Sequence, residues 1–147
     1  NIALAGLLSG MVQSTSSCTS LHSIEHGLTA THPDLPHGAG LLMLSKPYFT
    51  FFARYVPDRC IKMAHILGAS TDGLSDAEKP LAFVKAMTDL QQACGVADLK
   101  MSDYGVKIDE METIARNAHK TMSNLFAMDR YSLSLKETVD ILTQAYK

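Results

Sequence analysis

Apolar side chains recur along this chain at intervals of three and four residues, from one end to the other. This spacing places them on one face of an α-helix, whereas no stretch shows the sustained alternation of a half-buried β-strand. The pattern therefore predicts an all-α fold, a bundle of about six to seven helices joined by short turns. The expected helices cover, in order, residues 1–12, 15–31, 41–55, 58–68, 80–95, 109–125 and 134–146.

Start and stop signals set the boundaries between these helices. The second helix should end at His32-Pro33, because proline disfavours helical geometry in the residue before it. Capping-box spacing, in which a short polar residue is followed three positions later by a glutamate, predicts two later helix starts. The two boxes are Asp109 with Glu112 and Ser134 with Glu137.

The first twelve residues are apolar apart from a few small or polar positions. Gly6 and Gly10 would let another helix approach closely, and the segment lacks the basic start of a signal peptide. One face carries four large apolar side chains, Leu4, Leu7, Leu8 and Met11. We therefore interpret this segment as a helix of the core.

Composition narrows the class of protein. With 147 residues, 46% apolar and 19% charged, residues 1–147 have the make-up of a single globular domain. The net charge of -2, with both signs mixed along the chain, offers neither a basic stripe for nucleic acid nor a polybasic patch for a membrane. The three cysteines are widely spaced and form no CxxC pair, which argues against a disulfide framework and favours a reducing, cytoplasmic location.

Four of the six histidines lie close together, between positions 22 and 37. His22 and His26 are four residues apart, so on a helix both side chains stand on one face, with their β-carbons roughly 6 Å apart. A chain reversal after Pro33 would bring His37 to the same point, and imidazole is the commonest protein ligand for iron, zinc, copper and nickel. A lone histidine is more often a hydrogen-bonded structural residue than a ligand, but the clustering favours a metal site. His65 and His119, which stand alone, are expected in surface or capping roles, and His32 is expected only to end the helix.

Spacing alone leaves another metal chemistry open. His22, Glu25 and His26 spell HxxEH, the inverted zinc-protease pattern in which the glutamate activates a water molecule. Such a hydrolase needs a third ligand, for which Glu78, Glu110 or Glu112 are candidates, and a mixed α/β environment that the helical pattern does not predict. A further alternative is an isolated helical domain with neither metal nor activity.

The histidine segment resembles the second signature region of the iron-containing alcohol dehydrogenases. The resemblance lies in Gly10-Met11 within a small-residue helix, in the pair His22 and His26, and in Pro36-His37-Gly38. It continues in the order of segments to the end, where residues 117–126 and 129–147 look like that family's C-terminal stretch. By implication the chain is the C-terminal helical domain of a dehydroquinate synthase-like fold.

The resemblance also implies an activity and a set of roles. Family members are NAD(P)-linked alcohol dehydrogenases or aldehyde reductases, with a divalent metal held by one aspartate and three histidines between two domains. His22 and His37 match two metal ligands, and His26 matches the histidine beside the nicotinamide and the substrate, a catalytic and cofactor-binding position. Fe²⁺ is the expected metal, with Zn²⁺ also suited to the ligands; NAD or NADP is the expected cosubstrate, and a small alcohol or aldehyde the partner.

The departures from the family pattern are absences. No Asp-x-x-x-His precedes His22 to supply the other two ligands, and no G-x-G-x-x-G is present to bind a dinucleotide. By implication the chain is a C-terminal fragment that lacks the nucleotide-binding domain, binds metal weakly and is inactive alone. A bundle without its partner domain should also expose an apolar patch, through which it would form a homo-oligomer.

Overall fold

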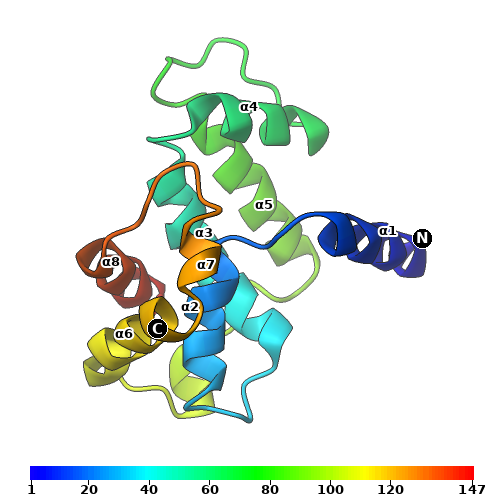
Figure 1. Cartoon of the computed structure of the whole chain (residues 1–147). Coiled ribbons are helices and arrows are strands. Elements are labelled where there is room, and N and C mark those ends of the chain that lie inside the picture. Colours follow the sequence, from blue (N-terminus) through cyan, green and yellow to red (C-terminus); the bar gives the residue numbers. More distant parts are fainter.

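The structure, a computed structural model, describes residues 1–147, and all its regular elements are helices (Figure 1). The all-α prediction is confirmed. The α-helices are α1 (Ile2–Thr15), α2 (Ser20–Thr29), α3 (His37–Phe52), α4 (Pro57–Ile66), α5 (Leu81–Ala93), α6 (Met111–Thr121), α7 (Ser123–Phe126) and α8 (Leu135–Ala145). Two 3₁₀ turns, Met101–Tyr104 and Ile108–Glu110, lie in the connection between α5 and α6.

The number of helices exceeds the expected six to seven because one predicted helix is broken. The apolar stripe of residues 109–125 indicated a single helix, but Met122 adopts φ -134° and ψ 42° and separates α6 from α7. Leu125 is buried all the same, so the stripe correctly identified an inward-facing residue beyond the break.

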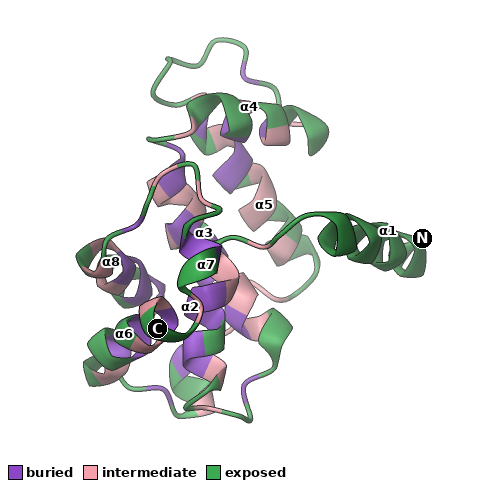
Figure 2. Cartoon of the chain, in the orientation of Figure 1, coloured by how far each residue is buried: buried purple, intermediate pink, exposed green.

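The main core lies where α2 packs against α3 and α6, with α8 packed against α3 and α6 in turn (Figure 1). Ile24 and Leu28 of α2, Leu44 of α3 and Leu142 of α8 are fully buried there. Each such side chain stabilises the fold by roughly 1.5–3 kcal/mol relative to an exposed one. The buried residues gather around α2, α3, α6 and α8 in Figure 2, so α2 is held on several sides.

The prediction that the first segment belongs to the core is wrong. Helix α1 extends away from the bundle, and none of its residues is buried (Figure 2). Leu4 is 58% exposed, and no atom lies within 4 Å of a Cβ built at Gly6 or Gly10. Helical periodicity shows which side chains share a face, but it does not show that another element covers that face, and within this chain none does.

No helix of the structure has the length and apolar character needed to cross a bilayer.

Of the two predicted capping boxes, one is confirmed and the other is wrong. The Ser134–Glu137 box is confirmed, since the Ser134 hydroxyl accepts the Glu137 N–H at 3.3 Å and the Glu137 carboxylate accepts the Ser134 N–H at 2.8 Å. The Asp109–Glu112 box is wrong, because the chain enters α6 through a 3₁₀ turn in which the Lys107 N–H donates to the Glu110 carboxylate at 2.7 Å.

A buried polar cluster fixes the start of α2. The Asp129 carboxylate accepts hydrogen bonds from the Ser20 N–H at 3.2 Å and from the Tyr48 hydroxyl at 3.1 Å, both on Oδ1. Its other oxygen, Oδ2, is buried without a hydrogen-bond partner. Burial raises the pKa of Asp129, against the opposing effect of these hydrogen bonds, and burial together with the Asp129 charge raises the pKa of Tyr48.

We expect Asp129→Asn to change how stability depends on pH. The folded-state pKa of Asp129 lies above the ordinary carboxyl value of 3.8. The stability that folding gains from the protonated Asp129 side chain is therefore fully present below pH 3.8, and it is lost as pH rises through the folded-state pKa. Asparagine keeps an acceptor for Ser20 and Tyr48 without the charge. Urea denaturation should therefore show the variant gaining stability over the wild type as pH rises from 4 to 7.5. A constant difference across that range would contradict this.

Candidate metal centre

The local sequence folds the histidine segment into a helical hairpin. His22 and His26 stand one turn apart on α2, which ends at Thr29, slightly before the predicted stop at His32-Pro33. The turn is tied by the Leu35 N–H, which donates to the His32 carbonyl at 3.0 Å, and by burial of the Leu35 side chain. His37 is the first residue of α3, so the reversal returns it to the side of α2 that carries the other two imidazoles.

The three predicted site histidines come together. The His37 ring centroid lies 5.3 Å from that of His22 and 5.2 Å from that of His26. All three histidine side chains line one cavity of about 300 Å³. The rest of its wall comes from the end of α1, the linker to α2, and the α6–α7 break, with the residues Gln13, Ser16, Ser17, Cys18, Met122 and Leu125.

The electrostatics favour neutral imidazole at the most enclosed of the three histidines. Burial lowers the pKa of His22, and the neighbouring His37 and His26 lower it further. Neutral imidazole is the form that binds a metal ion, so no proton has to be displaced from His22 at neutral pH.

Glu25 is the functional-site residue that sequence reasoning placed only in the protease pattern. Its side chain is fully buried, and its Oε2 is hydrogen-bonded to Nδ1 of His37. Oε1 is also buried and has no hydrogen-bond partner. Burial raises the pKa of Glu25, and the bond to His37 opposes that rise. No local pattern could have revealed this contact, because its residues lie on different helices.

These side chains fit a divalent metal ion. Possible ligand atoms of Glu25, His26 and His37 all lie within 4.8 Å of one another, a group that does not coincide with the predicted ligand pair of His22 and His37. The Glu25 oxygen nearest the rings is already bonded to His37, so Glu25 is better described as a partner of that imidazole than as a ligand. Three imidazoles facing one open cavity leave room for further ligands, as metal sites with exchangeable positions require.

The hydrolase alternative loses its support in this geometry. A water-activating glutamate has to face the metal, whereas the Glu25 carboxylate is buried and bonded to His37. None of the suggested third ligands lines the histidine cavity. Each is engaged elsewhere: Glu78 with Ser75, Glu110 with His32 and Lys107, and Glu112 with Arg116.

The remaining histidines have structural partners outside the cavity. His32 contacts the Glu110 carboxylate at 3.1 Å, and His65 contacts the Thr71 hydroxyl at 2.9 Å. His119 contacts the Thr138 hydroxyl at 2.9 Å and stacks on Phe126, with burial lowering its pKa.

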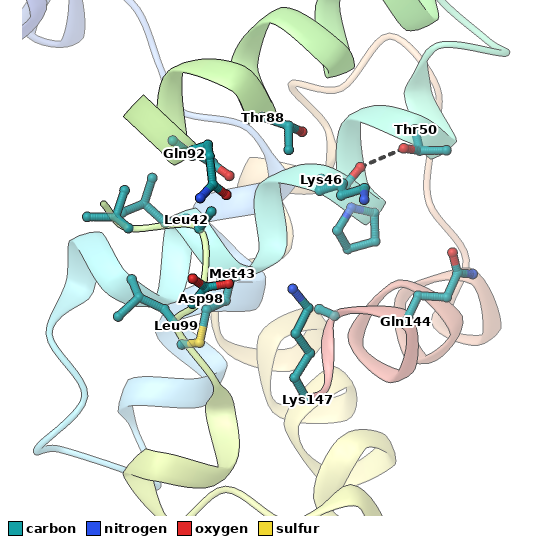
Figure 3. A pocket seen from close by; sticks show the side chains of 15 residues that line it. Leu42, Met43, Lys46, Thr50, Thr88, Gln92, Asp98, Leu99, Gln144 and Lys147 are labelled. Atoms are coloured by element: carbon teal, nitrogen blue, oxygen red, sulfur yellow. Dashed lines mark hydrogen bonds between the residues drawn. The ribbon is translucent and has the colours of Figure 1, made fainter. Parts of the chain in front are cut away.

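A larger cavity, of about 440 Å³, lies between α3, α5, residues 96–99 and the end of the chain (Figure 3). Lys46, Lys147 and Asp98 are its charged residues, and the rest of its lining is apolar or amide and hydroxyl side chains. It contains no histidine or cysteine and therefore offers no set of metal ligands comparable to the histidine cavity.

Comparison with known proteins agrees with the fold and with the family resemblance. The chain matches the Fe-containing alcohol dehydrogenase family, C-terminal, over residues 1–146. It is 28% identical to the 1,3-propanediol dehydrogenase of Citrobacter freundii over 146 residues, which are 99% of this chain and 37% of that protein.

Solved structures give the same result. An alcohol dehydrogenase from Oenococcus oeni has a TM-score of 0.83 and 28% identity, covering 95% of this chain and 35% of that one. An archaeal alcohol dehydrogenase from a Red Sea brine pool has a TM-score of 0.83 at 19% identity, which supports the fold alone. The chain therefore spans about a third of the length of the relatives it matches.

Proposed function

Because the chain belongs to the Fe-containing alcohol dehydrogenase family, we propose that residues 1–147 are the helical, metal-binding domain of a NAD(P)-linked alcohol dehydrogenase or aldehyde reductase. The observation that carries this proposal is the convergence of His22, His26 and His37 on one cavity. The substrate is a small alcohol or aldehyde, and the 300 Å³ cavity is large enough for its reacting end.

His22 and His37 would hold the metal, for which Fe²⁺ is expected and Zn²⁺ is also suitable. The family resemblance implies an aspartate and another histidine as well, and this chain offers no candidates for them before His22. When bound, the metal supplies Lewis-acid chemistry that polarises the substrate oxygen.

His26 is the proposed proton carrier. Its imidazole is exposed on the cavity and stands one turn from His22, so it can accept or release a proton at the substrate oxygen. The same position would place it beside the nicotinamide of NAD or NADP. Met122 and Leu125 also line the cavity and provide an apolar surface against which the carbon chain of a small alcohol can pack.

The metal-ligand assignment is tested by titrating the 147-residue chain with Zn²⁺, which is redox-stable, and following heat of binding. We expect His22→Ala and His37→Ala each to weaken binding by more than about 100-fold, because a direct ligand contributes at least as much as an outer-sphere partner. His32→Ala is the matched control, since His32 lies in the same segment but pairs with Glu110. It should bind Zn²⁺ like the wild type.

Two outcomes would contradict the assignment. Unchanged Zn²⁺ affinity in His37→Ala would remove His37 from the ligand set. Loss of binding in His26→Ala, with binding retained in His22→Ala, would transfer the ligand role from His22 to His26.

A further inference from the structure

We propose that Glu25 is a positioning residue, which sets the orientation and the tautomer of His37 for a metal ion in the histidine cavity. This inference rests on the proposed function, because it concerns the same cavity. It adds a residue to which neither the family signature nor the histidine spacing assigns this role.

Glu25 carries a buried carboxyl group. Its side chain is fully buried on α2 beside Gly40 of α3, yet a carboxylate loses favourable hydration when it is removed from water. Its one hydrogen-bonding partner is His37, and its second oxygen has none. The imidazole of His37 is therefore the one group that compensates this carboxylate through a direct hydrogen bond.

Glu25 contacts one particular nitrogen of the His37 imidazole. Glu25 Oε2 contacts Nδ1, so the Nδ1–H donates to the carboxylate and Nε2 is left as the free nitrogen. His37 also lines the cavity shared with His22 and His26, where that free nitrogen is available as a ligand. Carboxylate, imidazole and metal in this order is the general arrangement by which proteins fix a histidine ligand and raise its basicity.

Helix α3 leaves space for the Glu25 side chain at Gly40. A Cβ at position 40 would stand 2.8 Å from Glu25 Cγ and 2.9 Å from Oε1, closer than real Cβ atoms approach other atoms. Glycine at position 40 therefore provides the space in which the carboxylate reaches His37. The contact depends on two helices and on the absence of a side chain, which distinguishes it from an incidental surface pair.

A second histidine–carboxylate contact in the chain provides a control for the removal of the Glu25 charge. His32 and Glu110 form a second histidine–carboxylate contact, at 3.1 Å, outside the histidine cavity. Glu25→Gln and Glu110→Gln each remove one carboxylate charge from a histidine while keeping the size of the side chain. Only the first should alter metal binding.

The experiment combines two measurements on the full chain. In the metal-free protein, long-range ¹H–¹⁵N NMR spectra should show His37 as the Nδ1–H tautomer, and Glu25→Gln should introduce the Nε2–H form. In Zn²⁺ titrations, Glu25→Gln should weaken binding by about 10–100-fold, whereas Glu110→Gln should leave it unchanged.

A wild-type His37 in the Nε2–H form, or a Glu25→Gln variant with unaltered Zn²⁺ affinity, would overturn the proposal. The two measurements also separate it from the proposed function. If the wild type binds no Zn²⁺, the proposed function fails, and the tautomer of His37 in the metal-free protein still decides whether Glu25 orients it.

Discussion

Replacing Gly27 by alanine is expected to lower the free energy of unfolding by roughly 3 kcal/mol. Gly27 lies on α2 where it packs against α6, and a Cβ there would stand 2.9 Å from the backbone oxygen of Ile114. It would also stand 3.3 Å from the Ala118 Cβ. A backbone oxygen within a helix cannot turn aside, so α2 and α6 would have to separate. The better helix propensity of alanine, about 1 kcal/mol, offsets only part of this cost.

Thermal unfolding followed by circular dichroism measures the effect, which should appear as a fall in Tm of roughly 5–10 °C. Gly10→Ala is the control, because Gly10 is also inside a helix but has no atom within 4 Å of its Cβ position. It should not lower the Tm. If Gly27→Ala unfolds at the wild-type temperature, the close approach of α2 to α6 is wrong.

The helices themselves could be predicted from sequence because the signals that form them are local. The stripe on α6 correctly marked Ile114, Ala115 and Ala118 as buried, and α2 ends at Thr29, close to the stop that Pro33 predicted. The same local signals predicted the wrong environment for α1, whose apolar face has no partner within the chain. The break at Met122 was missed as well, since the apolar spacing continues through it to Leu125.

In the candidate site, too, some features follow from local sequence signals and others do not. The pairing of His22 with His26 follows from helical spacing, and the arrival of His37 follows from a short turn after Pro33, so both were predictable. The role of Glu25 depends on contacts between α2 and α3 that no spacing rule contains. In the sequence, Glu25 even suggested a different chemistry, because HxxEH is a local pattern while its buried contact with His37 is not.

The space beside Glu25 leads to the second large expected effect, which concerns Gly40. Gly40→Ala should push the Glu25 carboxylate away from His37, because the new Cβ would clash with Cγ and Oε1 of a fully buried side chain. We expect a loss of about 1–3 kcal/mol in unfolding free energy. We also expect Zn²⁺ affinity to fall about 10-fold or more, as for loss of an outer-sphere partner.

Gly38→Ala separates this effect from a general effect of alanine at the start of α3. Gly38 is two residues earlier on the same helix, and no atom lies within 4 Å of its Cβ position. Alanine there should keep the wild-type Zn²⁺ affinity and raise stability by up to about 1 kcal/mol.

A double-mutant cycle then identifies the clashing partner. With Glu25 already replaced by alanine, the space beside residue 40 is vacant, so adding Gly40→Ala should no longer destabilise the protein. The coupling between the two substitutions should therefore be favourable, in the range of about 0.5–3 kcal/mol found for residues in direct contact. An equal cost of Gly40→Ala with and without the Glu25 carboxylate would mean that the helix start, and not the carboxylate beneath it, requires glycine. In that case Gly40 would not be required to make space for Glu25, and the positioning role of Glu25 would lose the support of α3.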